Sequence, residues 1–208
     1  MTTIYLIRHS EGFQKLQGNI LTKDSVQLIN EKNPLSVDGE ILAKNISLNS
    51  EFKNIDNLFS SSYVRAMATA KYFAVNNNLK VNIDDRLNER IQGIKSWDEL
   101  PNDFEKNQLI DEYYKIGFGE SQKEVRKRME EVFYEILNNN LNKRIIIVSH
   151  ATAITFLLKK WCIIEYQKPY IFNDKIFFDG NWNYCETFKL IFDEYNNLIS
   201  IENLKLVG

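Results

Sequence analysis

The heptapeptide IYLIRHS, at positions 4–10, decides how the rest of the sequence is interpreted. A run of apolar residues ends there in an arginine followed by a histidine. The chain has only two histidines among 208 residues, and the second closes another apolar run, RIIIVSHATAI at positions 144–154. Continuous apolar runs of this length are typical of strands buried on both faces of a parallel sheet. Each histidine therefore stands at the carboxyl end of an expected strand.

Expected strands and helices alternate along the chain. Strands are expected at 3–8, 57–61, 80–84 and 144–149, helices at 35–48, 63–77, 121–139 and 151–161, and a strand pair at 187–194 and 198–206. Ser36 is the expected N-cap of the first of these helices, and residues 85–118 are expected to form loops and short helices. This order predicts one α/β domain over residues 1–208, a three-layer sandwich with a mainly parallel central sheet and helices on both faces.

The composition is that of an ordinary globular protein, with 44% hydrophobic and 26% charged residues. A net charge of -2 provides no basic field for nucleic acid or an anionic membrane. No apolar run approaches the roughly 20 residues that a membrane helix needs, and the first residues do not resemble a signal peptide. We therefore expect a cytoplasmic protein in which Cys162 and Cys185 are reduced, structural thiols.

The residues at the expected strand ends suit phosphate chemistry. Ligands of open α/β sheets bind outside the carboxyl ends of the strands, where the RH and SH pairs and the segment SSSYVR at 60–65 are all expected. A neutral imidazole such as His9 is a good nucleophile toward phosphorus, and the planar fork of arginine contacts phosphate oxygens in pairs. We therefore expect His9, His150, Arg8 and Arg65 to surround a single phosphoryl group.

A leaving alkoxide needs a proton, which a carboxylic acid can supply. The candidate is Glu89, in the segment DDRLNERIQG at 84–93 that follows an expected strand. Asp84, Asp85 and Glu99 are nearby acids and therefore alternatives. A zinc site is disfavoured because RHSE and SHA lack the usual ligand spacings.

Together these motifs resemble the histidine phosphatase superfamily, the broad group that includes cofactor-dependent phosphoglycerate mutases. The resemblance extends through IYLIRHSE, NPLSVDGEILAKN, FSSSYVRAMATAKY, RLNERIQG, FGESQKEVRKRM and IIIVSHATAI, which cover residues 3–155 in the order of the family. It implies a phosphoglycerate mutase-like fold and a small phosphorylated metabolite as substrate. It implies no metal or organic cofactor for the phosphatase members.

The resemblance also implies a role for each candidate residue. His9 matches the nucleophile that becomes phosphorylated, Arg8 and Arg65 the phosphate-binding arginines, His150 the second pocket histidine, and Glu89 the general acid.

The sequence departs from the family at two positions and leaves others open. Ser10 and Ala151 stand where the family commonly has glycine after each histidine. Both residues are small, so we expect their backbone to approach the substrate phosphate. Gln14, Lys15 and Gln17 are candidates for a further substrate donor, and the GES element at 119–121 has no assigned role.

Three functions remain open at this point. The first is a phosphomonoesterase that acts through a phosphohistidine on His9. The second is a phosphoglycerate mutase, which returns the phosphoryl group to its substrate; the ERxxG pattern at 89–93 is mutase-like, but the interval 90–118 is short for one. The third is a catalytically silent module that binds phosphorylated ligands. The substrate and the oligomeric state stay open.

Overall fold

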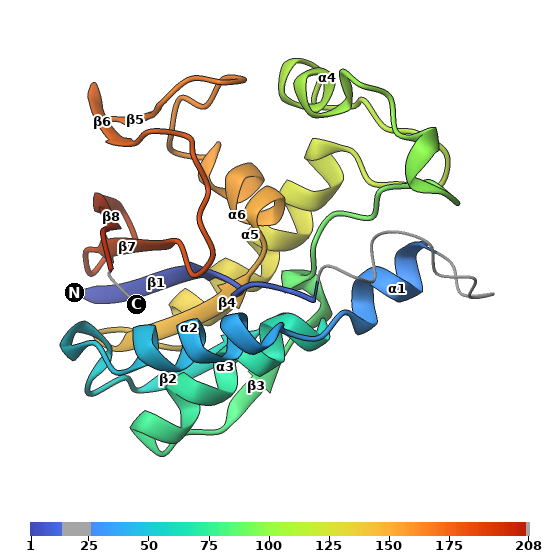
Figure 1. Cartoon of the computed structure of the whole chain (residues 1–208). Coiled ribbons are helices and arrows are strands. Elements are labelled where there is room, and N and C mark those ends of the chain that lie inside the picture. Colours follow the sequence, from blue (N-terminus) through green and yellow to red (C-terminus); the bar gives the residue numbers. More distant parts are fainter. Residues whose placement is uncertain (14–25, 207–208) are drawn as a thin grey trace.

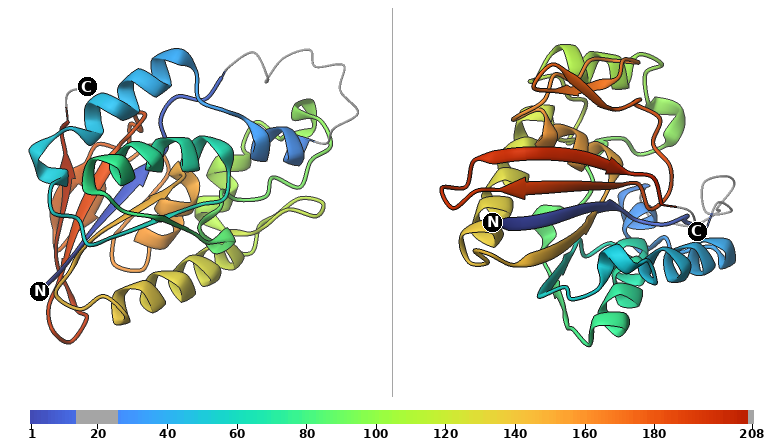
Figure 2. Two further views of the ribbon diagram at one scale, coloured as in Figure 1. Left: turned by 90° about the horizontal axis from the view of Figure 1, so that it is seen from below. Right: turned by 90° about the vertical axis from the view of Figure 1, so that its left-hand side faces the viewer.

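The computed structural model describes residues 1–13 and 26–206 (Figure 1). Within this part of the chain a six-stranded sheet has the order β3-β2-β4-β1-β7-β8. Its strands are β1 (Thr2–Arg8), β2 (Asn57–Ser60), β3 (Val81–Ile83), β4 (Arg144–Ser149), β7 (Thr187–Phe192) and β8 (Leu198–Leu204). The first four run parallel, whereas β7 is antiparallel to both of its neighbours. The expected mainly parallel sheet, with a hairpin at its edge, is confirmed (Figure 2).

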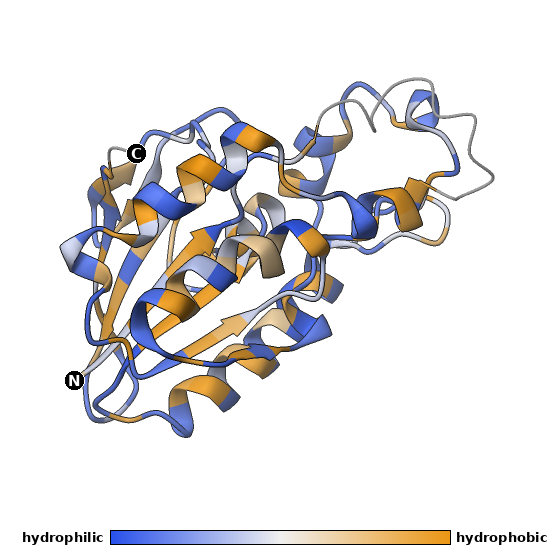
Figure 3. Ribbon diagram, turned by 60° about the horizontal axis from the view of Figure 1, so that its bottom comes forward, coloured by the Kyte–Doolittle hydropathy of each residue, from blue (hydrophilic) through white to orange (hydrophobic). Residues whose placement is uncertain are grey.

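Helices cover both faces of this sheet. The helices α2 (Val37–Ser47) and α3 (Val64–Asn77) pack on one face, and α5 (Gln122–Asn138) and α6 (Ala151–Leu158) pack on the other. Successive side chains of a strand point to opposite faces, so Tyr5 and Ile7 join the core with α2 and α3 while Ile4 and Leu6 join the core with α5 and α6. Apolar residues accordingly line the strands and the inner sides of the helices (Figure 3). The three-layer sandwich is confirmed.

Side-chain caps determine where two of the helices begin. Ser36 is the N-cap of α2 and accepts a hydrogen bond from the Gly39 N–H, as expected. Ser121 caps α5 in a capping box with Glu124, in which each side chain accepts from the backbone N–H of the other residue. Such caps satisfy N–H groups that lack partners inside the helix. The helix α6 ends at Leu158, three residues before the expected end.

Several elements lie outside the expected set or refine it. They are α1 (Val26–Lys32), the 3-10 turns η2 (Ser50–Phe52), η3 (Asp85–Leu87) and η4 (Trp97–Glu99), the helix α4 (Phe104–Ile110), and the hairpin strands β5 (Tyr170–Phe172) and β6 (Lys175–Phe178). The sequence did not predict α1 or the β5–β6 hairpin. The helix α4 lies beyond α6, away from the sheet (Figure 1). The hairpin packs against the sheet edge, since the centroid of the Phe178 ring lies 5.1 Å from that of the Phe188 ring of β7, and Tyr170 and Phe178 are buried in the core. None of the described helices is long and apolar enough to cross a membrane.

The register of β1 against β4 positions the candidate site. Arg8 pairs with Ser149, so the next residues on the two parallel strands are His9 and His150. The His9 N–H still donates to the Ser149 carbonyl at 2.9 Å, which extends the ladder by one bond. The two histidines, 141 positions apart in sequence, therefore leave the sheet side by side.

Candidate active site

Both histidines are buried at the carboxyl edge of the sheet, with their ring centroids 5.0 Å apart. His9 follows β1, and His150 is the N-cap of α6. Arg65 lies in the first turn of α3, directly after β2, and is buried as well. These side chains thus follow three neighbouring parallel strands and lie together at the carboxyl edge of the sheet, as the sequence predicted.

The Arg65 guanidinium bridges the two imidazoles. Its Nε–H donates to His9 Nε2 at 2.9 Å, and its Nη2–H donates to His150 Nδ1 at 3.1 Å. A third nitrogen, Nη1, donates to the Asn30 carbonyl of α1. Because a guanidinium has donors only, both ring nitrogens that it contacts must act as acceptors.

These contacts define the tautomer of each ring. His9 Nδ1 lies 2.7 Å from the Ser10 carbonyl, which can only accept, so Nδ1 carries the proton and Nε2 the lone pair. His150 has the opposite arrangement: Nδ1 accepts from Arg65, and Nε2–H donates to Ser61 Oγ at 2.8 Å. The Ser61 hydroxyl in turn donates to Asn88 Oδ1 at 2.6 Å. A nucleophilic nitrogen on His9 therefore faces the interior of the site.

Burial and nearby positive charge keep both imidazoles neutral. Burial lowers the pKa of His9 well below the usual value for histidine, and the charges of Arg65 and Arg8 lower it further, whereas the hydrogen bond to Ser10 acts in the opposite direction. The pKa of His150 is lowered well below its usual value by burial first, then by Arg65 and its histidine neighbour. A neutral imidazole retains the lone pair that attack on phosphorus requires.

Arg8 approaches the cluster from the end of β1. Its Nη1 donates to the carbonyls of Trp182 and Asn183, at 3.1 and 3.3 Å, and its guanidinium lies over the Tyr184 ring. The segment that precedes β7 therefore holds this arginine in place, a contact that the sequence did not reveal. Arg8 is close enough for its charge to lower the pKa of both histidines.

The two positions where glycine is common in the family differ in their contacts. The Ser10 N–H donates to Thr69 Oγ1 at 2.9 Å, and its hydroxyl donates to the Gly39 carbonyl at 2.7 Å. Ser10 thus anchors the backbone that holds His9, which differs from the expected backbone contact to phosphate. Ala151 is the first residue of α6, where helical N–H groups favour anions.

Glu89 lies at the same helix start. Its carboxylate accepts from the Ala153 N–H at 3.0 Å and the Thr152 N–H at 3.3 Å, and also from the Arg90 N–H at 2.9 Å. Negative charge is stabilised at a helix N-terminus by the free N–H groups and the helix dipole. Glu89 is therefore brought beside His150.

Two of the three alternative acids have partners elsewhere, whereas Asp85 lines the same cavity as Glu89. Asp84 forms an ion pair with Arg86, and Glu99 accepts from the exposed Lys95 N–H. Gln14, Lys15 and Gln17 lie outside the described residues. Among the residues that the structure describes, no group of three or more His, Cys, Asp or Glu side chains is arranged to hold a metal ion. Cys162 and Cys185 are buried, unpaired thiols, as expected.

Two cavities flank this cluster. One, of about 430 Å³, lies between α6, α4 and the segments around 165–170 and 179–182; its lining includes Thr152 and Trp182, which contact Glu89 and Arg8. The other, of about 460 Å³, lies toward α1 and is lined by Glu89 itself, Tyr63 and Glu120. Neither lining includes the two histidines, but one contains Glu89 and the other contains Thr152, which contacts it, so space for an organic group is available beside Glu89.

The sequence missed several residues of the site. Ser61 and Asn88 orient His150, and Asn30 holds Arg65. The position of Ser61, at the end of the strand expected over 57–61, was the available signal. A backbone carbonyl such as that of Asn30 leaves no signal in a sequence, because every residue has one.

Comparisons with known proteins identify the family of this chain. The family model described as histidine phosphatase superfamily (branch 1) matches residues 4–174. The chain belongs to the histidine phosphatase superfamily. None of the curated protein sequences matches it significantly.

Solved structures of the same fold resemble this member of the superfamily over nearly its whole length. Phosphoserine phosphatase from Entamoeba histolytica is similar in two crystal structures. A mutant in complex with phosphoserine has 21% identity and a TM-score of 0.69, covering 97% of each chain. A complex with 3-phosphoglyceric acid has 20% identity and a TM-score of 0.69, covering 99% of this chain and 98% of the other.

A mycobacterial glucosyl-3-phosphoglycerate phosphatase, in a complex with VO3, has 16% identity and a TM-score of 0.70, covering 97% of this chain and 96% of the other. At these levels of identity the similarity shows the fold alone.

Proposed function

We propose that this protein is a phosphomonoesterase that hydrolyses a small phosphorylated metabolite through a covalent phosphohistidine on His9. The observation that carries the proposal is the Arg65 guanidinium, which donates to both His9 Nε2 and His150 Nδ1. It places a cation and a nucleophilic nitrogen at the same point. Phosphoryl transfer depends on this kind of positioning and charge stabilisation.

In the first step, His9 Nε2 attacks phosphorus and the bond between phosphorus and the ester oxygen breaks. The Arg65 Nε–H turns from His9 Nε2 to a phosphate oxygen, assisted by Arg8, while its Nη2–H keeps the bond to His150 Nδ1. Glu89 enters this step as the carboxylic acid and gives its proton to the departing alkoxide, which leaves as an alcohol. The carboxylate that remains is stabilised by the Thr152 and Ala153 N–H groups. Nδ1–H of His9 keeps its bond to the Ser10 carbonyl, which accepts from the now cationic ring.

In the second step, the Glu89 carboxylate takes a proton from a water molecule that attacks the phosphohistidine. The bond between phosphorus and Nε2 breaks, inorganic phosphate leaves, and His9 and Glu89 return to their starting states. His150, with its proton fixed on Nε2 by Ser61, keeps its Nδ1 acceptor toward Arg65 and so orients that guanidinium. The cycle needs water as its only co-reactant.

The phosphatase activities named for the similar solved structures support hydrolysis over mutase activity. We propose accordingly that the substrate is a small metabolite whose organic part occupies one of the two cavities beside Glu89.

The experiment is a turnover assay of the purified protein with p-nitrophenyl phosphate and a panel of sugar and amino-acid phosphates between pH 5 and 8. Release of phosphate, absent in His9→Ala, is the expected result. No turnover with any substrate contradicts the proposal and favours a silent binding module. A coupled assay for conversion of 3-phosphoglycerate to 2-phosphoglycerate covers the mutase alternative; conversion faster than hydrolysis would replace the phosphatase assignment.

A further inference from the structure

We propose that Glu120 and Arg128 position the carboxylate of Glu89 and so set the rate of proton transfer to the leaving group. The inference rests on the proposed function, because it concerns the step in which the ester bond breaks. It assigns a role to the GES element at 119–121. Neither residue contacts the two histidines, and both line the cavity beside Glu89. The role proposed for them is that of positioning residues, which act through that acid.

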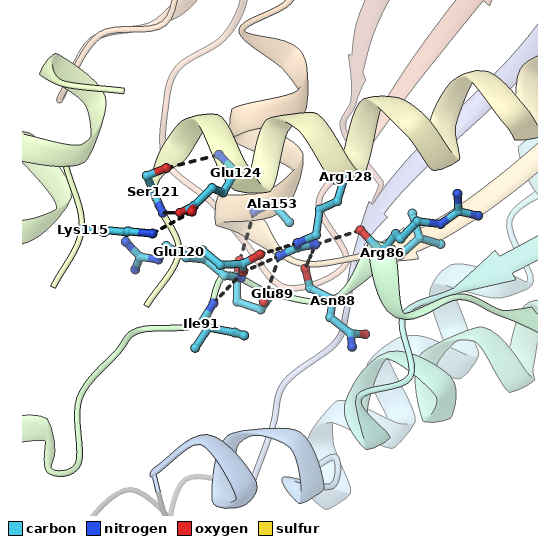
Figure 4. Close-up of polar contacts among 12 residues, drawn as sticks. Arg86, Asn88, Glu89, Ile91, Lys115, Glu120, Ser121, Glu124, Arg128 and Ala153 are labelled. Atoms are coloured by element: carbon cyan, nitrogen blue, oxygen red, sulfur yellow. Dashed lines mark hydrogen bonds and ion pairs between the residues drawn. The ribbon is translucent and has the colours of Figure 1, made fainter. Parts of the chain in front are cut away.

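The segment that carries Glu89 is irregular from residue 88 to residue 96. Its backbone therefore lacks the regular hydrogen bonds of a helix or a sheet, and its carbonyl groups need other donors. Arg128, on the second turn of α5, supplies them (Figure 4). Its Nη1 donates to the carbonyls of Arg86 and Asn88, both at 2.8 Å, and its Nη2 donates to the carbonyl of Glu89 at 3.3 Å.

Glu120 completes the arrangement from the other side. Its Oε1 accepts from Arg128 Nε at 2.8 Å and its Oε2 accepts from Arg128 Nη2 at 2.9 Å, so the ion pair is bidentate. Oε2 also accepts from the Ile91 N–H at 3.0 Å, and the Glu120 N–H donates to the Ile91 carbonyl at 2.9 Å. The backbone is thus held at residues 88 and 91, on either side of Glu89.

The donors of Arg128 match these acceptors in number. A guanidinium has five N–H bonds, and the structure gives this one five acceptors: three carbonyls and two carboxylate oxygens. A lysine at the same position has three donors around a single nitrogen and cannot reproduce this fork. The pattern indicates a site built for arginine, since a surface cation would not require all five contacts.

Glycines allow the two segments to approach this closely. Gly93 has φ +82°, and a Cβ there would lie 2.1 Å from the Ile116 carbonyl oxygen and 2.4 Å from the Gly119 nitrogen. A Cβ on Gly119 would lie 2.7 Å from the Gln92 carbonyl oxygen. The backbone of the acid-bearing segment is therefore in direct contact with the segment that leads into Glu120.

The same arrangement also reaches His150. The Asn88 carbonyl accepts from Arg128, and the Asn88 side chain accepts from Ser61, the residue that fixes the proton on His150 Nε2. Arg128 thereby supports both the acid and the orientation of the second histidine. Arg128 contacts the backbone carbonyl of Glu89, whereas the carboxylate of Glu89 is bound by N–H groups at the N-terminus of α6. The contacts of Arg128 therefore determine where Glu89 lies.

The test compares two substrates that differ in their need for an acid. Glycerol 2-phosphate releases an alkoxide that must be protonated, whereas p-nitrophenyl phosphate releases a stable anion. For R128K we expect kcat/KM to fall by about 10- to 100-fold with the alkyl ester, as for a small displacement of a catalytic group, and by less than about 3-fold with the aryl ester. Removal of the acid should make Arg128 irrelevant, so R128K added to E89Q should change kcat/KM for glycerol 2-phosphate no further.

The matched control is R126K, on the same helix. Arg126 pairs with Glu112 and Glu130, away from the acid-bearing segment, and its replacement should leave both substrates unaffected. Equal losses with both substrates, or an R128K effect that persists in full in the E89Q background, would overturn the inference. Should R128K fail to fold, E120Q is judged by the same outcomes. A wild-type protein that turns over neither substrate would instead contradict the proposed function.

Discussion

The two halves of the candidate site are built in different ways. His9, His150 and Arg65 follow directly from strands and a helix start, and the register of β1 against β4 determines where both histidines lie. Glu89 sits in an irregular segment whose position depends on side-chain contacts from α5. The nucleophile half is therefore held by the sheet, whereas the acid half is held by a few polar side chains and glycines. Mutations should therefore separate the two halves.

The largest effect is expected in the nucleophile half. His9→Ala removes the nitrogen that attacks phosphorus, so kcat with p-nitrophenyl phosphate should fall by about 10⁴-fold or more. The β1–β4 register does not depend on the imidazole, so circular dichroism should still show the folded protein. Steady-state kinetics on the purified wild-type protein and variant measures the difference in kcat. Residual activity above a hundredth of the wild-type value would mean that another group attacks phosphorus.

The next effect is expected in the acid half and depends on the leaving group. Glu89→Gln keeps the size and the acceptor oxygen but removes the exchangeable proton, so kcat/KM for alkyl phosphates should fall by about 10³-fold. The loss with p-nitrophenyl phosphate should be much smaller, and inhibition by inorganic phosphate should change little because an acid acts mainly in the transition state. A loss of the same size in phosphate affinity and in turnover would contradict the assigned role.

A smaller effect should follow from distorting the acid-bearing backbone alone. Gly93→Ala forces a left-handed φ on alanine and a clash with the Ile116 carbonyl, which should cost about 1–3 kcal/mol of unfolding free energy. Urea unfolding measures this loss. kcat/KM for alkyl phosphates should fall about 10-fold while the aryl ester changes little. Wild-type stability and unchanged kinetics would show that this segment tolerates displacement.

The elements of the sheet could be predicted from the sequence because buried parallel strands have continuous apolar runs, as in residues 144–149. The helix N-cap at Ser36 could also be predicted, because it depends on the side chain of that residue alone. The helix α1 was missed because only Val26 of its seven residues is buried, so its apolar periodicity is weak. The β5–β6 hairpin did have a signal: Asn173 and Asp174, both with positive φ, occupy its turn.

The part of the site that follows regular strands could also be predicted from the sequence. Residues that follow strands, such as His9 and Arg65, could be expected to meet at the edge of the sheet. The contacts of Arg128 could not be inferred, because three of its five acceptors are backbone carbonyls of an irregular segment. Sequence patterns identify side chains, and carry little information on where a loop presents its backbone.

The smallest expected effect is a dependence of the unfolding free energy on pH, caused by the protonation of His9 and His150. The folded-state pKa of both histidines is lowered by burial, whereas in the unfolded chain each has a pKa of about 6.5. Below that pH the unfolded state binds more protons, so the unfolding free energy should fall as the pH drops, by at most about 1.4 kcal/mol per histidine and pH unit. Above about pH 7 the unfolding free energy should no longer change with pH because of the two histidines.

Chemical unfolding between pH 5.5 and 7.5 measures this dependence. Because the chain has only two histidines, the double variant H9N/H150N is a matched control that should lose this slope. Stability that stays constant or rises as the pH falls from 6.5 to 5.5 would mean that the folded protein binds these protons and that the imidazoles are not held neutral.

The most direct test of the central claim is to quench the reaction with base during turnover of a labelled substrate and to map the phosphorylated residue by mass spectrometry. We predict a base-stable, acid-labile phosphoryl group on His9 that is absent in His9→Ala and accumulates in Glu89→Gln during turnover of p-nitrophenyl phosphate, because water is then activated more slowly. Turnover without a phosphorylated protein, or a label on any residue other than His9, would contradict the account.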